Sequence, residues 1–176
     1  LASFGELLDK KGLSLNDKTK LFNLMDEQRG KFTYLGYEFD VSSSSRGVRM
    51  SAAKLIKYKD RIEKAFNDYG AKVAFIPQKA AKELVMRCLY LTGNMRLLNR
   101  KSNAFIGVYY SNKYITDVSQ LRALDYLLRA RVDPLTDVRL KRKLSRLSFE
   151  RGFVQKEFRN FSTKNLSEIS QGWKHA

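Results

Sequence analysis

The sequence predicts an α+β protein in which a small antiparallel sheet comes first and a mainly helical region follows. Residues 32–41 alternate in the period of two that is typical of a strand. From Ser51 onward, apolar residues recur every three or four positions, which is typical of helices. The charge changes at the same point. Residues 1–50 carry eight Lys/Arg and seven Asp/Glu, whereas residues 51–176 hold nearly all of the net charge of +16.

These changes divide the chain into three parts, at residues 1–50, 51–132 and 133–176. The first part should hold the sheet, the second a helical domain, and the third a basic helical extension. About fifty residues are too few for an independent core, so the first part is expected to pack on chain that precedes Leu1. The absence of an initial Met agrees with this expectation of a longer protein.

The first part should begin with a helix over residues 1–11 that stops at Gly12. Short strands are expected next, and the longest strand carries the aromatic alternation. Gly36 in that strand leaves room for another backbone or a ligand, although a plain core glycine is the simpler alternative. The expected order after the helix is a strand at 13–16, a strand at 19–25, a loop at 26–31, the long strand at 32–41, a turn at 42–47 and a short strand at 48–50.

The helical part has clear start signals. Ser51 is a favourable N-cap for a helix that should reach Tyr69 and stop at Gly70. Pro77 should open the next helix, which ends near residues 92–94. Later helices are expected after Asp117, over residues 135–147 and from residue 162. Residues 104–110 fit a strand or the start of a helix equally well.

The helix after Ser51 carries a basic stripe beside its apolar one. Its spacings of three and four place the stripe roughly 120° round from the apolar face. One face can therefore pack on a bundle while the other meets phosphates, although a solvated face with i,i+4 ion pairs is the alternative. A second basic set lies in residues 135–147. The predicted phosphate-binding residues are Lys54, Lys57, Arg61, Lys64, Arg139, Arg142 and Lys143.

Other residue types limit the possible functions. A single histidine and the single cysteine, Cys88, exclude a Cys/His zinc site. Cys88 is expected to be a core residue, and a lone cysteine without an internal disulfide fits a reducing cytoplasm. No run of eighteen apolar residues is present, so no membrane span is expected. The aromatic residues at 149, 153, 158 and 161 are expected to pack in the core rather than to stack on bases.

Two motifs resemble a known family. Residues 12–19 read Gly-Leu-Ser-Leu-Asn-Asp-Lys-Thr, and residues 32–37 read Phe-Thr-Tyr-Leu-Gly-Tyr. In this order they resemble the end of the palm of a reverse transcriptase, where the second motif belongs to a hairpin called the primer grip and a helical thumb follows. Later stretches at 55–62 and 91–96 are similar to bacterial reverse transcriptases associated with antiviral defence. One departure concerns Lys18, which follows Asn16 after one residue where the family often has two.

The resemblance implies an RNA-directed DNA polymerase that binds template–primer nucleic acid and Mg²⁺, with the possibility of a structured non-coding RNA partner and of an oligomer. It implies that Lys18 approaches the nucleotide phosphates. The alternative, given equal weight, is that Lys18 is a surface lysine in a turn. The implied primer-grip residues are Phe32, Tyr34, Leu35, Gly36 and Tyr37.

The resemblance places the carboxylates that would hold Mg²⁺ upstream of Leu1. No Asp-Asp pair occurs in the sequence, so this chain alone should not polymerise. The alternative function is a non-catalytic basic helical module for RNA binding or assembly.

Overall fold

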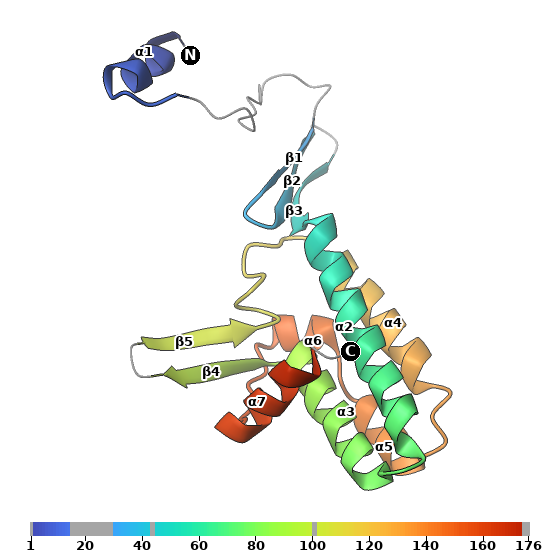
Figure 1. Cartoon of the computed structure of the whole chain (residues 1–176). Helices are drawn as coiled ribbons and strands as arrows, with labels where there is room; N and C mark the ends of the chain where they lie inside the picture. Colours follow the sequence, from blue (N-terminus) through green and yellow to red (C-terminus); the bar gives the residue numbers. More distant parts are fainter. Residues whose placement is uncertain (1, 15–29, 43–44, 100–101, 174–176) are drawn as a thin grey trace.

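The computed structural model describes residues 2–14, 30–42, 45–99 and 102–173, and it confirms the predicted α+β class (Figure 1). A three-stranded antiparallel sheet leads into a helical body, from which a two-stranded ribbon projects. In chain order the elements are α1 (Ala2–Lys10), β1 (Lys31–Tyr34), β2 (Tyr37–Ser42), β3 (Ser45–Met50), α2 (Ala52–Val73), α3 (Pro77–Thr92), β4 (Asn94–Asn99), β5 (Ser102–Gly107), α4 (Ser119–Val132), α5 (Val138–Leu144), α6 (Phe149–Val154) and α7 (Thr163–Gly172).

The long strand predicted over residues 32–41 is wrong, because the chain reverses in its middle. Leu35 and Gly36 have φ angles of 47° and 79°, so β1 and β2 form a hairpin with a two-residue turn. Two positive φ angles are the mark of a type I′ turn. The aromatic alternation continues across the turn, because Tyr34 pairs with Tyr37 and Phe32 with Phe39. Gly36 is therefore a turn glycine rather than a glycine in mid-strand.

Most predicted helices are present, with changed ends. Ser51 caps α2 through its hydroxyl, which accepts from the Lys54 N–H, and Pro77 starts α3. The predicted stop at Gly70 is wrong, because α2 continues to Val73. The helix predicted over residues 135–147 is shorter, since Asp137 caps α5 and the helix ends at Leu144.

The sequence analysis predicted no hairpin after α3. In the structure, β4 begins directly after Gly93 and pairs with β5. The undecided segment 104–110 is thus a strand as far as Gly107 and a turn beyond it. Leu13 and Ser14 have no regular structure, and the remaining residues of the strands predicted at 13–16 and 19–25 lie outside the described part. The structure does not test the division at residues 50 and 132.

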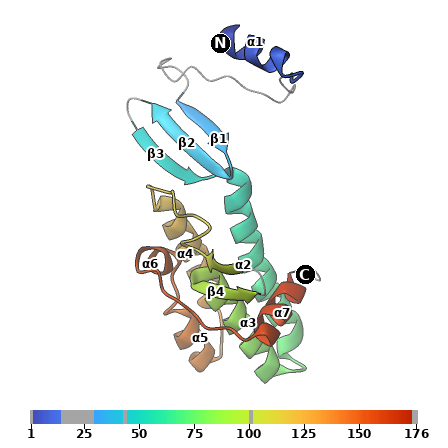
Figure 2. The same cartoon turned by 90° about the vertical axis from the view of Figure 1, so that its left-hand side faces the viewer.

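The core lies between α2, α3, α4 and α6 and holds Ile62, Leu84, Leu121, Leu124 and Phe149, each at most 1% exposed. The apolar stripe of α2 faces this core, as its spacing predicted. Cys88 is also in the core at 1% exposure, which confirms its predicted place. The views in Figures 1 and 2 show α2 running from the sheet to the far end of the helical body.

The sheet is joined to the body along β3. The backbone N–H of Val48 donates to the Thr116 hydroxyl, and the Thr116 N–H donates back to the Val48 carbonyl. The Gln120 side chain pairs in the same way with both backbone groups of Met50. The segment before α4 therefore covers the outer edge of β3, and it fixes the sheet relative to α2 and α4.

Candidate nucleic-acid interface

The turn between β1 and β2 brings two of the implied primer-grip side chains to the surface. Tyr34 is 61% exposed and Leu35 is 77% exposed. Phe32 stacks on Phe39 with ring centroids 4.9 Å apart, and Tyr37 points inward at 9% exposure. The hairpin therefore presents its tip to the outside while its flanking aromatic residues hold it together.

The tip lies on the first turn of α2. The Ser51 N–H donates to the Gly36 carbonyl over 3.0 Å. The Lys54 ammonium lies 4.5 Å from the centroid of the Tyr37 ring and donates to the Ser111 carbonyl. Burial lowers the pKa of Lys54 from its usual value. The sequence analysis predicted the primer grip and the basic stripe separately. The structure brings them into contact at Gly36, Tyr37, Ser51 and Lys54.

The other stripe residues continue along α2. Lys57 is exposed, Lys64 is half-buried, and the Arg61 guanidinium lies 5.7 Å from the ring of Trp173 at the end of α7. Two acidic residues of α2 pair with residues outside the stripe, since Glu63 contacts Arg131 of α4 and Asp68 contacts Lys72 and Arg87. In the described residues, none of these three cations has a salt bridge, so the i,i+4 alternative for Lys64 is not seen there.

The second basic set lies on α5. Arg139, Arg142 and Lys143 are all exposed. Arg139 and Lys143 line a groove whose floor is apolar and whose other walls come from α3 and Asn165 at the start of α7. Trp173, beside Arg61, lies at the other end of α7. The two basic sets therefore flank opposite ends of one helix and do not form one continuous stripe.

The described acidic residues do not fit a Mg²⁺ site. Asp40 pairs with Lys31, and Asp117 pairs with Arg49 over 2.6 Å. Asp125 accepts from the Phe149 N–H and the Ser148 hydroxyl at the start of α6. Among the described residues, no group of three or more acidic, histidine or cysteine side chains is close enough to hold a metal ion.

Lys18, the implied nucleotide-binding residue, lies outside the described part of the chain, so its position is untested. Within the described part, no helix has the length and the apolar character that a membrane crossing requires.

Sequence reasoning missed the root of the β4–β5 ribbon. Asn94 is fully buried there, and Phe158, predicted as a core aromatic, is 48% exposed. Phe149 is fully buried as predicted. No local pattern pointed to this cluster, because Tyr109 and Tyr110 lie in a turn, where the alternation of a strand does not apply.

Comparisons of the chain with protein-family models, with curated proteins and with solved structures give no match.

Proposed function

We propose that this chain is the palm end and thumb of an RNA-directed DNA polymerase, and that it holds a template–primer duplex by its sugar–phosphate backbone. The observation that carries the proposal is the junction of Gly36 and Tyr37 with Ser51 and Lys54. It sets an exposed hairpin tip at one end of a helix whose stripe cations Lys57, Arg61 and Lys64 have no carboxylate partner in the described residues. The resemblance of residues 12–19 and 32–37 to a reverse transcriptase supports the same arrangement.

In this function α2 acts as a backbone clamp. Successive turns of a helix are about 5 Å apart, so Lys57, Arg61 and Lys64 offer cations at intervals close to those of phosphates along a strand. Contacts with phosphates hold a duplex without reading its sequence, and an enzyme that moves along its template needs this property. The hairpin tip would then meet the end of the primer.

The wider parts of the proposal follow from the resemblance. The catalytic carboxylates and the Mg²⁺ they hold would belong to chain that precedes Leu1, and the bound ion would supply stabilisation of the reacting phosphates. The full protein would act in bacterial antiviral defence. The residues described here position nucleic acid and take no part in the chemical step.

The experiment uses Leu35→Asn in the full-length protein. Asn adopts a positive φ more easily than Leu, so the variant should melt at a higher temperature than the parent. It also removes the apolar side chain at the hairpin tip. If the tip positions the primer, nucleotide incorporation per folded molecule should fall about tenfold or more while duplex affinity stays within about twofold.

Phe75→Asn is the matched control, because Phe75 is 84% exposed in the connection between α2 and α3, beyond the other end of α2. It should leave incorporation unchanged. An unchanged rate in Leu35→Asn would overturn the primer-grip assignment. If the unmodified full-length protein binds duplex but incorporates no nucleotide in the presence of Mg²⁺, the polymerase function is wrong. The non-catalytic RNA-binding module is then the better assignment.

A further inference from the structure

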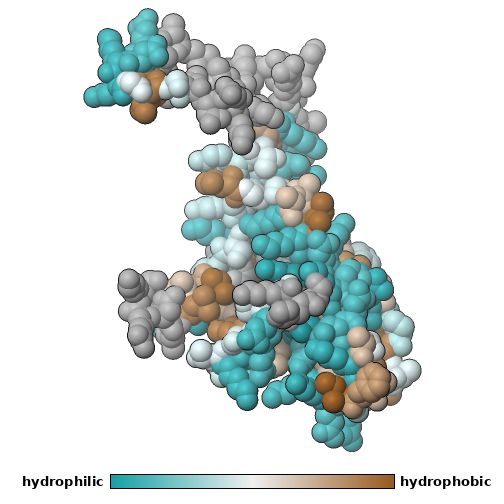
Figure 3. Space-filling view, viewed as in Figure 1, coloured by the Kyte–Doolittle hydropathy of each residue, from teal (hydrophilic) through white to brown (hydrophobic). Residues whose placement is uncertain are grey.

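A group of aromatic rings lies at the root of the β4–β5 ribbon, away from the hairpin tip of the proposed primer grip. Phe105 of β5 stacks on Tyr110 with centroids 5.0 Å apart, and Phe158 meets both rings edge-on at 5.9 Å. Phe105 is 45% exposed and Phe158 is 48% exposed. We call these three residues the aromatic platform. Figure 3 shows hydrophobic surface on the ribbon in an otherwise hydrophilic neighbourhood.

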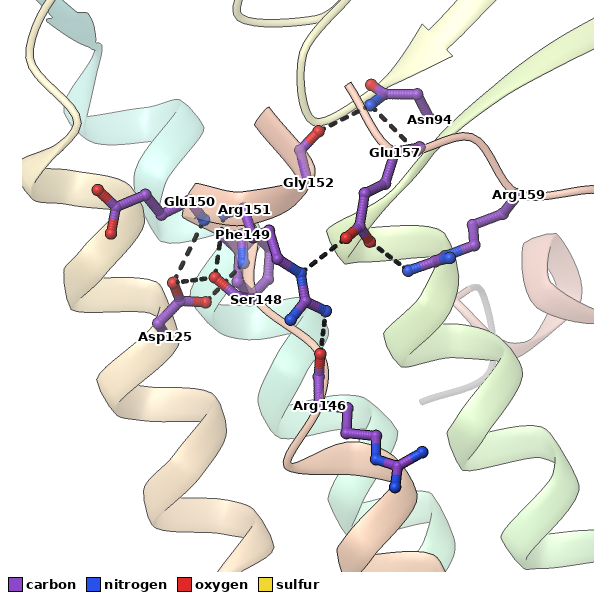
Figure 4. Close-up of polar contacts among 10 residues, drawn as sticks. All are labelled: Asn94, Asp125, Arg146, Ser148, Phe149, Glu150, Arg151, Gly152, Glu157 and Arg159. Atoms are coloured by element: carbon purple, nitrogen blue, oxygen red, sulfur yellow. Dashed lines mark hydrogen bonds and ion pairs between the residues drawn. The ribbon is translucent and has the colours of Figure 1, made fainter. Parts of the chain in front are cut away.

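Cations border the aromatic platform. The Arg96 guanidinium lies 5.8 Å from the centroid of Phe105, and the Lys156 ammonium lies 4.5 Å from that of Tyr109. Both cations are exposed. The nearby Glu157 is held by Arg151 and Arg159, so its charge is compensated on both sides (Figure 4). The surface therefore combines exposed rings with an excess of positive charge.

The aromatic platform rests on a rigid base. The fully buried Asn94 donates to the carbonyls of Gly152 and Glu157 (Figure 4). It also accepts from the Tyr109 N–H over 2.8 Å, so one side chain ties three segments together. The parallel bridge between Asn94 and Phe158 adds a backbone link. A Cβ at Gly152 would overlap the Thr92 carbonyl, so the backbones are in direct contact. The rings are thus held in place before any partner arrives.

We propose that the aromatic platform binds single-stranded nucleic acid by stacking bases on Phe105 and Phe158, while Arg96 and Lys156 contact the adjoining phosphates. Every base has a flat π face, and single-strand binding proteins combine exposed aromatic rings with a positive groove in this way. Charge complementarity favours this occupant, because residues 51–176 carry nearly all of the chain's net charge of +16. A paired duplex hides its base faces, so this site differs from the clamp on α2. The inference shares with the proposed function only the polyanionic partner.

The test measures binding of the full-length protein to single-stranded oligonucleotides of about a dozen residues that contain 2-aminopurine, in RNA and DNA forms. Stacking should change the 2-aminopurine fluorescence on binding. The double variant Phe105→Leu/Phe158→Leu keeps the apolar volume and removes the rings. It should weaken single-strand affinity by about tenfold or more, the size of a lost base–ring stack. Duplex affinity should stay within about twofold, and Phe105→Tyr/Phe158→Tyr should restore single-strand binding.

A second variant tests the proposed phosphate contacts of Arg96 and Lys156. Arg96→Gln/Lys156→Gln should lower the slope of log affinity against log salt for the single strand by about 1.4. Phe75→Leu, which removes an exposed ring at a remote site, should change nothing.

Three results would overturn the aromatic platform. The first is an unchanged single-strand affinity in a folded Leu double variant. The second is an equal loss of affinity in Phe75→Leu. The third is a Leu double variant that changes its oligomeric state or its vesicle binding while its oligonucleotide binding stays the same. Because duplex affinity is measured on the same proteins, a failure here is distinct from a failure of the clamp on α2.

Discussion

The ammonium group of Lys54 lies 4.5 Å from the centroid of the Tyr37 ring, which links the first turn of α2 to β2. The Tyr37 hydroxyl donates to the Ser111 carbonyl over 3.1 Å, and Lys54 donates to the same oxygen. The two side chains therefore share one acceptor in the loop before α4. The ammonium of Lys54 thus helps to hold the sheet on the helix. Its contact with phosphates stays a prediction.

Because of this relationship, Lys54 and its neighbour in the basic stripe, Lys57, should differ in their effects on stability and on duplex binding. Lys54→Gln should lower the free energy of unfolding by about 0.5–1 kcal/mol, since it removes a cation–π contact. Lys57→Gln should leave stability within about 0.5 kcal/mol, because Lys57 is exposed. Lys57→Gln should lower the salt slope of duplex binding by about 0.9, and Lys54→Gln should lower it less. Urea unfolding and salt titrations measure both. The reverse order would show that Lys54 contacts the nucleic acid.

The two basic sets should contribute separately to duplex binding. Replacing Lys57, Arg61 and Lys64 by Gln should lower the salt slope by about 2.7, because each lost phosphate contact removes about 0.9. The fold should persist, because the buried face of α2 is untouched. The control is Arg139→Gln/Arg142→Gln/Lys143→Gln on α5, which measures that set alone. Equal small effects of both triple variants would mean that each surface is merely solvated.

Two glycines should respond to alanine in opposite directions. Gly70 lies inside α2 with open space around its Cβ position, so Gly70→Ala should stabilise the fold by about 0.5–1 kcal/mol. Gly152→Ala would drive a methyl group into the Thr92 carbonyl, and it should destabilise by about 3 kcal/mol or more. Chemical denaturation measures both. A neutral Gly152→Ala would contradict the close packing of α6 on the end of α3.

Cys88 should be unreactive while the chain is folded. Burial raises the pKa of its thiol to about 12, so almost no thiolate is present at pH 8. In the unfolded chain the pKa returns to about 8.5. The raised pKa contributes stability that is fully present below about 8.5 and is lost as the pH rises toward 12. A thiolate-specific reagent at pH 8 should therefore label Cys88 only in denaturant. Rapid labelling of native protein would contradict its burial, and Cys88→Ala controls for other reactions.

The sequence predicted the helices whose signals are local. The hydroxyl groups of Ser51 and Ser162 cap the starts of α2 and α7. Pro77 is the first residue of α3, where its fixed φ angle suits a helix. The hairpin at Leu35–Gly36 could not be seen in the same way. Its strands carry the same aromatic alternation on both sides, so the reversal leaves the period of two intact. Leu at a position with positive φ also lacks the Asn or Gly that announces such a turn.

The candidate site was predictable only in its helical part. Regular spacing placed Lys57, Arg61 and Lys64 on one face of α2, which the structure retains. The role of Lys54 depends on Ser111, a residue 57 positions away, and spacing along one helix contains no information about such contacts. The exposure of Phe158 likewise depends on its pairing with Asn94 across two chain segments.

The uninterrupted length of α2 has a mechanical consequence. With 22 residues, the helix is about 33 Å long, and it connects the sheet at one end with the α2–α3 turn at the other. Because the helix is stiff, a small rotation about its lower end displaces its upper end. A tilt of about 5° about the lower end would carry the Leu35–Gly36 tip through roughly 3 Å, about the rise of one nucleotide along a strand. In the proposed polymerase, a small rocking of α2 would therefore move the hairpin tip by about the length of one nucleotide.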